Sequence, residues 1–373
     1  MLVSSREAVS ASVAPQARLA SLDAFRGLAV LGMLVVNNKA FGPWTPSQLI
    51  HGDWADVHLA DLIFPWFVLI VGVALPLAEA SARRRGFAGI RRLGKVLLRA
   101  GWLVAIGILI NSSYAHHPLF DLGILQLIGV SYLLTALLYR LPLRARVAAA
   151  AILLVGHWAA LRFTPLPGLP AGTFTETRNF VDRLEDLYLQ RLHLEHLTSV
   201  VTLTALMLVG TFAGDYLQRA PEARSRQARG LLLAGAAGVL AGWLWGLEQP
   251  MVKRLVTASF TLFSAGTGLM ALAGCYWLVD VLRRRTWSFP LVVLGRNALA
   301  AFALPILVNI YVLGGWTWPG RDGSAAPLGR ALLEGFVRHA GVGLGGVLFT
   351  FSLVTAWWLV CYGLYRHRVF VRV

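Results

Sequence analysis

The chain has 373 residues, of which 57% are hydrophobic and 14% are charged, whereas soluble proteins are about 45–50% apolar and about 25% charged. This composition leaves too little polar surface for a water-soluble fold, so it excludes soluble enzymes and predicts a membrane protein. The formal net charge of +16 would suggest nucleic-acid binding in a soluble protein, but here its distribution along the chain decides its meaning.

The N-terminal segment, residues 1–18, is rich in Ser and Ala and lacks the compact apolar run of a signal peptide, so we expect a disordered cytoplasmic tail. Residues 19–373 are expected to form a single transmembrane domain. Cys275 and Cys361 lie within apolar runs without C-x-x-C spacing, which predicts packing roles and no disulfide framework.

Ten apolar runs have the length needed to cross a hydrocarbon core of about 30 Å. They cover residues 20–38, 57–79, 95–111, 121–139, 146–162, 197–217, 229–247, 256–281, 290–313 and 342–365. The sequence therefore predicts an all-α polytopic membrane protein with about ten transmembrane helices.

The positive charges test this topology, because Lys and Arg concentrate in cytoplasmic connections. One alternating set of connections contains 21 of the 34 Lys and Arg residues, the opposite set contains 10, and three lie within spans. We therefore expect both termini in the cytoplasm. The positive net charge is then explained by the topology, together with attraction to anionic lipid headgroups. It does not indicate a nucleic-acid partner.

Ionisable groups within a bilayer are expensive and therefore mark candidate sites. Asp23 and Arg26, at the start of the first span, are three residues apart and share a helix face, so they either form a local ion pair or belong to a site. Asn37 lies at the far end of the same predicted helix, where asparagine can also serve as a C-terminal cap.

A second cluster of polar residues precedes the second span on its outer side. It holds His51, Asp53, Asp56, His58 and Asp61. A histidine in a loop is usually a solvated surface residue, and the aromatic residues nearby also suit an interfacial belt. Spacing alone leaves both a reactive histidine and a solvated loop as explanations.

The segment from Leu19 to Gly72 carries S-L-D-x-F-R-G, V-V-N, H-x-x-W and D-L-I-F-P-W-F-x-x-x-V-G in this order. It resembles the heparan-α-glucosaminide N-acetyltransferase family of transmembrane acyltransferases, in a bacterial-type form. Shorter similarities follow at residues 91–99, 125–132, 181–184 and 295–298, the last of which includes Asn297.

The resemblance implies transfer of an acetyl group from cytosolic acetyl-CoA to a sugar-like acceptor, an amino sugar or glycan, outside the cytoplasm. It places the family's catalytic histidine at His51 and its supporting asparagine at Asn37, both on the outer side in the predicted topology. His51 would act as a general base on the acceptor or through an acetyl-imidazole. Asn37 would donate a hydrogen bond to the thioester oxygen.

Coenzyme A carries phosphates that need cations at the cytoplasmic mouth. The candidates are Arg26, Arg92, Lys95 and Arg99. Lys95 and Arg99 are one helical turn apart and present two donors on one face, although the positive-inside rule explains the same cluster without a ligand.

Acceptor binding or structural support is assigned to six further residues, Asp23, Trp54, Asp61, Glu195, Lys253 and Asn297. The resemblance aligns Glu195 with the acid of a D-P-E-G motif whose other positions here are His193, Leu194 and His196. Because of this departure from the motif, the sequence does not predict the identity of the acceptor. The order H-L-E-H also lacks the H-E-x-x-H spacing of a zinc site, so no metal is expected.

Lys253 is a positive charge on the predicted outer side, where it could meet an acidic acceptor or pair with Glu248. A transporter of sugars or small solutes is the main alternative function, with His51 and the acids near it lining a gate or proton path. A non-catalytic assembly subunit would leave the early motifs unexplained. Expected partners are the bilayer of the cell (inner) membrane, acetyl-CoA, a glycan acceptor and a second copy in a homodimer.

Overall fold

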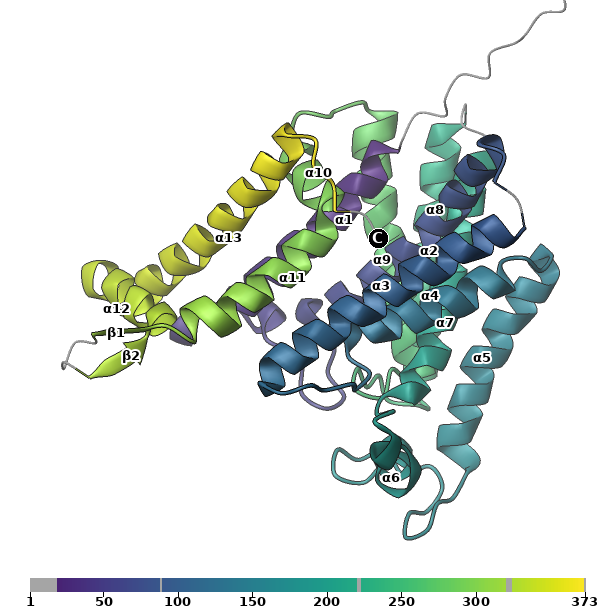
Figure 1. Cartoon of the computed structure of the whole chain (residues 1–373). Helices are drawn as coiled ribbons and strands as arrows, with labels where there is room; N and C mark the ends of the chain where they lie inside the picture. The colour runs from purple at the N-terminus through teal and green to yellow at the C-terminus, as the bar shows by residue number, and fades with distance from the viewer. Residues whose placement is uncertain (1–18, 88, 220–222, 320–323, 372–373) are drawn as a thin grey trace, which may run out of the picture.

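The computed structural model describes residues 19–87, 89–219, 223–319 and 324–371, whose regular secondary structure is almost wholly helical (Figure 1). The predicted disordered tail, residues 1–18, lies outside the described residues. The helices long and apolar enough to cross a membrane are α1 (Ala20–Asn38), α2 (Leu59–Arg84), α3 (Ile90–Ala115), α5 (Leu143–Phe163), α7 (Leu197–Arg219), α8 (Arg224–Gly246), α9 with η5 (Ala258–Val281) and α13 (Val342–Arg366).

Two of the ten predicted spans take a different form. Helix α4 (Ile124–Leu138) has 15 residues, about 22 Å at 1.5 Å per residue, which is shorter than a core of about 30 Å. The ninth segment is a pair, α10 (Phe289–Arg296) and α11 continuing through η6 (Ala298–Leu313), bent by 75°. All ten predicted segments are helical, so the all-α polytopic class is confirmed, while the orientation of the termini stays a prediction.

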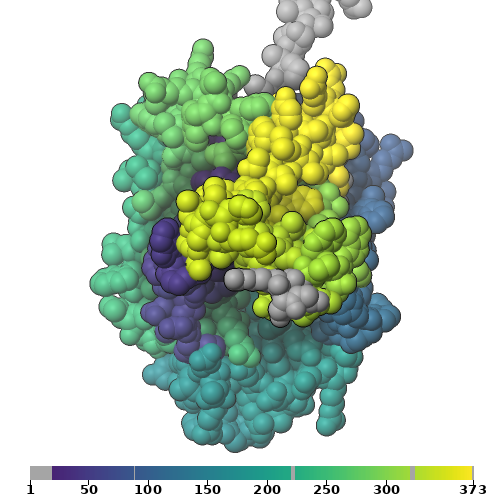
Figure 2. All heavy atoms as spheres, turned by 90° about the vertical axis from the view of Figure 1, so that its left-hand side faces the viewer, coloured from purple at the N-terminus to yellow at the C-terminus, as the bar shows by residue number. Residues whose placement is uncertain are grey.

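The remaining elements are short and lie in the connections: η1 (Gly42–Trp44), η2 (Ser47–Leu49), α6 (Phe180–Leu184), η3 (Glu185–Leu189), η4 (Gln190–Leu192), β1 (Thr317–Pro319), β2 (Ala325–Pro327) and α12 (Leu328–Ala340). The connection that holds α6 lies at the bottom of Figure 1, and the start of α1 and the end of α13 lie at the top. Figure 2 shows α12 and α13, in yellow, on one face of the molecule above that teal connection.

Helices α2 and α7 form the centre of the packed core. A β-carbon on Gly72 of α2 would lie 2.2 Å from the carbonyl oxygen of Met207, and one on Gly210 of α7 would lie 2.4 Å from that of Leu69. Because each glycine faces the other backbone, the two helices approach closely, as small residues allow in membrane packing.

A second close approach joins α1 to α10. A β-carbon on Gly27 would lie 1.8 Å from the carbonyl oxygen of Leu291, and one on Gly295 would lie 1.9 Å from that of Asp23. This contact sets the bend between α10 and α11 against the first turns of α1, so that Arg26 and Arg296 reach the same space.

Candidate active site

A cavity of about 1030 Å³ lies between α1, α2, α3, α4 and the bent α10–α11 pair. Its lining follows α1 from Asp23 to Asn37, which is about 21 Å along a helix that rises 1.5 Å per residue. Helix α2 returns along the same path, with Ala60 and Ile63 packed against Val36 at one end. The cavity therefore follows roughly two thirds of a hydrocarbon core of about 30 Å.

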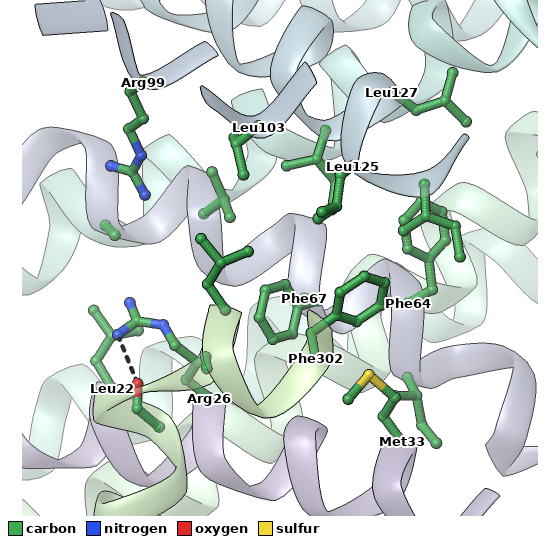
Figure 3. Close-up of a pocket in the computed structure, with 18 of the residues that line it drawn as sticks. Leu22, Arg26, Met33, Phe64, Phe67, Arg99, Leu103, Leu125, Leu127 and Phe302 are labelled. Carbon is green, nitrogen blue, oxygen red and sulfur yellow. Dashed lines mark hydrogen bonds between the residues drawn. The ribbon is translucent and has the colours of Figure 1, made fainter. Parts of the chain in front are cut away.

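Arginine side chains gather at the end of the cavity where α1 begins. The arginines in this part of the lining are Arg26, Arg84, Arg85, Arg99 and Arg296. Figure 3 shows Arg26 and Arg99 turned toward the same space. The Nε atoms of Arg99 and Arg296 are buried and have no hydrogen-bond partner among the described residues. Because a buried donor without a partner is costly, this end suits an anionic ligand.

Asp23 holds two of these arginines in place. Its side chain is buried, and its Oδ1 accepts a hydrogen bond of 3.2 Å from Arg26 Nη1. Its Oδ2 lies 3.8 Å from Arg296 Nε, and Arg26 also reaches the carbonyl oxygen of Gly295 at 3.5 Å. The ion pair expected from the spacing of Asp23 and Arg26 is therefore present, and it orients cations that line the cavity.

The middle of the cavity is apolar. Its walls include Met33 of α1, Phe64 and Phe67 of α2, Leu125 of α4 and Phe302 of α11, which lie to one side of the two arginines in Figure 3. An elongated uncharged chain could occupy this stretch without leaving a polar group of the wall unsatisfied.

His51 lies at the other end of the cavity, in a network centred on Asp61. Asp61 is 2% exposed, and its Oδ1 lies 2.8 Å from His51 Nδ1 and 3.0 Å from Lys253 Nζ. Its Oδ2 accepts the backbone N–H groups of Gly52 at 2.9 Å and His58 at 3.0 Å. With four donors around it, the carboxylate is held ionised, and it fixes the loop that carries His51.

Two groups with opposite hydrogen-bonding roles contact Nδ1 of His51. Asp61 Oδ1 only accepts, whereas Lys253 Nζ, 2.9 Å from the same nitrogen, only donates. In the tautomer that bonds to Asp61, Nδ1 carries the ring proton, Nε2 keeps its lone pair, and the Lys253 ammonium bonds to the shared carboxylate oxygen. In that tautomer the half-exposed ring presents a basic nitrogen beside the cavity.

Asn37 also lines this part of the cavity and is exposed. It lies within α1, whose C-terminal cap is Lys39, so it is not a capping residue. The neighbouring Asn38 is buried, donating to the carbonyl oxygen of Leu34 at 2.8 Å and accepting from Asn309 at 3.3 Å. The Asn37 amide has no hydrogen bond within the described ranges and is available to a ligand.

Two predicted donor-site cations lie away from the cavity. Lys95 is exposed, and its Nζ lies 3.2 Å from the centroid of the Phe87 ring. Arg92 Nη1 pairs with Glu79 Oε2 at 3.1 Å. Neither residue contributes to the lining, whereas Arg26 and Arg99 do.

Besides Asp61, three of the residues assigned to acceptor binding or support are absent from the cavity lining. Trp54 Nε1 donates to the carbonyl oxygen of Phe174 at 2.6 Å and so ties the His51 loop to the connection around α6. Asn297 is fully buried at the bend between α10 and α11 and accepts the backbone N–H of Val371 at 3.1 Å. Glu195 is partly buried, and its Oε2 lacks a hydrogen-bond partner among the described residues.

Three lining residues were not assigned to the site from the sequence: Arg84, Arg85 and Arg296. Arg84 and Arg85 were fully explained by the positive-inside rule, which gave no reason to place them in a cavity. The signal for Arg296 was its position within an apolar segment, where a charge is rarely without function. Arg254, which also lines the cavity, is held by Asp182 at 3.1 Å.

Comparison with known proteins gives consistent matches. Residues 18–240 match the family model described as heparan-alpha-glucosaminide N-acetyltransferase, catalytic. The human heparan-alpha-glucosaminide N-acetyltransferase is 35% identical over 183 residues, covering 42% of this chain and 27% of the human protein. The mouse protein of the same name is 39% identical over 127 residues, covering 32% of this chain and 19% of the mouse protein. The chain spans less than a third of the length of these curated relatives in the matches.

Proposed function

The chain belongs to the heparan-alpha-glucosaminide N-acetyltransferase catalytic family, and on this premise we propose that it transfers an acetyl group from acetyl-CoA to an amino sugar or glycan across the membrane. One observation carries the proposal. A single cavity is lined by arginines at one end and by Asn37 and His51 at the other. Donor and acceptor can therefore approach from opposite sides and meet within the protein.

The arginine end is proposed to bind the phosphates of coenzyme A. Guanidinium groups suit this role because their forked donors match phosphate oxygens. The support is the lining by Arg26, Arg99 and Arg296, and the buried Nε atoms of the last two, which lack hydrogen-bond partners in the described part of the chain. The uncharged pantetheine arm would follow the apolar middle, which brings the thioester toward Asn37.

At the His51 end, direct transfer would begin when the acceptor amine attacks the thioester carbonyl carbon. Nε2 of His51 takes the proton from the amine, the C–S bond breaks, and coenzyme A leaves as the thiolate. The Asn37 amide donates to the carbonyl oxygen while negative charge develops there. A two-step route would use the same atoms, with Nε2 attacking first and the acceptor then taking the acetyl group from the imidazole.

The test uses purified protein in detergent with radiolabelled acetyl-CoA and glucosamine. We expect labelled N-acetylglucosamine from the wild type and a loss of about 10²–10⁴-fold in His51→Ala, because a positioned general base contributes that much. His117→Ala is the matched control, since His117 is an exposed loop histidine whose one hydrogen bond among the described residues joins its Nδ1 to the carbonyl oxygen of Pro118 at 3.2 Å. Unchanged transfer in His51→Ala would remove His51 from the mechanism.

Binding of acetyl-CoA separates this proposal from the transporter alternative. A ligand at 100 times its Kd stabilises the folded state by about 2.7 kcal/mol, so acetyl-CoA should raise the melting temperature of the detergent-solubilised protein. Sugar uptake by reconstituted vesicles, without any response to acetyl-CoA, would support a transporter instead. Mass spectrometry after mixing with acetyl-CoA alone would detect an acetylated histidine if the two-step route operates.

A further inference from the structure

Two histidines in the connection before α7 have an unusual backbone conformation. His193 has a φ of 54° and His196 a φ of 64°, in the left-handed region that residues other than glycine rarely occupy. Such strained positions persist when the surrounding structure holds them, and they cluster at functional sites. The two residues differ in one respect: His196 lines the cavity and His193 does not.

The backbone of His196 is fixed on both sides. Its N–H donates to Oε1 of Glu185 at 2.6 Å, and Glu185 is itself buried. Its carbonyl oxygen accepts the N–H of Ser199 at 2.9 Å, in the first turn of α7. Both bonds use main-chain atoms of His196, so they hold the position without engaging the imidazole.

The His196 imidazole is free to meet a ligand. Its Nδ1 lies 3.7 Å from Glu185 Oε1, which is too long for a hydrogen bond, and the ring makes no hydrogen bond within the described ranges. The side chain is 47% exposed and shares this part of the cavity with His51 and Lys253. A neutral imidazole offers one donor and one acceptor, the pair of functions that matches a hydroxyl group.

We propose that His196 selects the acceptor by hydrogen bonding a hydroxyl of the same sugar whose amine is acetylated at His51. This inference rests on the proposed function and deepens it, because it names a residue of this chain that distinguishes sugar acceptors by their hydroxyl groups. A site built to hydrogen-bond a hydroxyl rejects an analogue that lacks it, since the polar group of the protein is then left without a partner.

The experiment compares His196→Gly with His193→Gly in the full-length protein. Glycine adopts the left-handed conformation freely and keeps the backbone N–H to Glu185, so both variants should fold with melting temperatures near that of the wild type. The acceptors are glucosamine and its 3-deoxy and 4-deoxy analogues. We expect the wild type to prefer glucosamine over at least one analogue by roughly tenfold or more.

In His196→Gly the KM for glucosamine should rise by about tenfold and the preference over that analogue should disappear, while kcat and the KM for acetyl-CoA stay within about threefold. His193→Gly should keep the preference, because its ring contacts Asp121 at 3.2 Å outside the cavity. His196→Asn should retain part of the preference, since asparagine tolerates the left-handed region and carries a donor and an acceptor.

Three results would overturn the inference and leave the proposed function intact. They are an unaltered preference in His196→Gly, an equal loss of preference in His193→Gly, and a wild type that accepts all three sugars equally. If the wild type acetylates no amino sugar at all, the proposed function fails and this inference fails with it.

Discussion

The charged groups at the two ends of the cavity differ in how fully they are paired. Around Arg99 the lining cations outnumber the single lining acid, Asp23, and two buried Nε atoms lack hydrogen-bond partners among the described residues. Around His51 the buried carboxylate of Asp61 receives four donors. The arginine end therefore has hydrogen-bond donors that an anion could use. At the other end the donors are bonded to Asp61, which orients the His51 ring. Substitutions at the two ends should accordingly affect different kinetic constants.

The largest effect is expected from Asp61→Asn. An amide in this position can donate to His51 Nδ1, which would move the ring proton to Nε2 and remove the base. By analogy with the orienting aspartate of serine proteases, kcat should fall by about 10²–10⁴-fold, as in His51→Ala, while the KM for acetyl-CoA stays unchanged. Steady-state transfer of the acetyl group from radiolabelled acetyl-CoA measures both constants, and a kcat within tenfold of the wild type would contradict the tautomer that pairs Nδ1 with Asp61.

Asn37→Ala should follow, with a loss of about 10²–10³-fold in kcat, the usual effect of removing one donor to a developing oxyanion. Asn38→Ala provides the contrast, because the buried Asn38 amide bonds to Leu34 and Asn309. That variant should lower the free energy of unfolding by about 1–3 kcal/mol, which is read as a lower melting temperature. Its effect on kcat should be smaller than that of Asn37→Ala. If Asn38→Ala instead caused the large loss of kcat and Asn37→Ala lowered the melting temperature, Asn38 rather than Asn37 would be the donor to the oxyanion.

Arg99→Ala should raise the KM for acetyl-CoA by about 10–100-fold, because a hydrogen bond to a charged group contributes about 1.5–3 kcal/mol. The kcat at saturating donor should change little. Lys95→Ala is the matched control one turn away on α3, where the ammonium group lies over Phe87 outside the lining. Equal effects of the two substitutions would show that general surface charge, rather than the cavity, attracts the donor.

The smallest effect is expected from Trp54→Phe, which removes the donor to the Phe174 carbonyl oxygen and keeps most of the ring. The free energy of unfolding should fall by about 0.5–1.5 kcal/mol, read as a lower melting temperature in detergent. Acceptor kinetics should change by less than about threefold, because Trp54 lies behind the lining. A loss as large as that of Asn37→Ala would place Trp54 against the substrate.

Hydropathy was sufficient to predict the helical class, because each spanning helix must carry its own apolar run. It could not predict the bend at Asn297, since the run from Pro290 to Leu313 is apolar on both sides of the break. The bend depends on how Gly27 and Gly295 fit the α1–α10 contact, and that fit exists only in three dimensions. The short length of α4 was likewise obscured by apolar residues at its ends.

The candidate site likewise contains some residues that the sequence indicated and others that only the structure brings together. Motif resemblance singled out His51 and Asn37, and Asp61 lies only ten residues beyond His51. Lys253, by contrast, is separated from His51 by 202 positions, so no spacing rule could bring the two together. His196 was visible only as a departure from a motif, and its role depends on a backbone angle that the sequence does not display.

The phenylalanine-lined middle of the cavity has a consequence for the cell that carries this protein. A passage that follows most of the bilayer would discharge the gradients of protons and sodium if water filled it continuously. Phe64, Phe67 and Phe302 offer no oxygen atoms to replace the hydration shell of an ion, and apolar stretches can interrupt water columns. Under the proposed function, the membrane can thus stay electrically sealed during acetyl transfer.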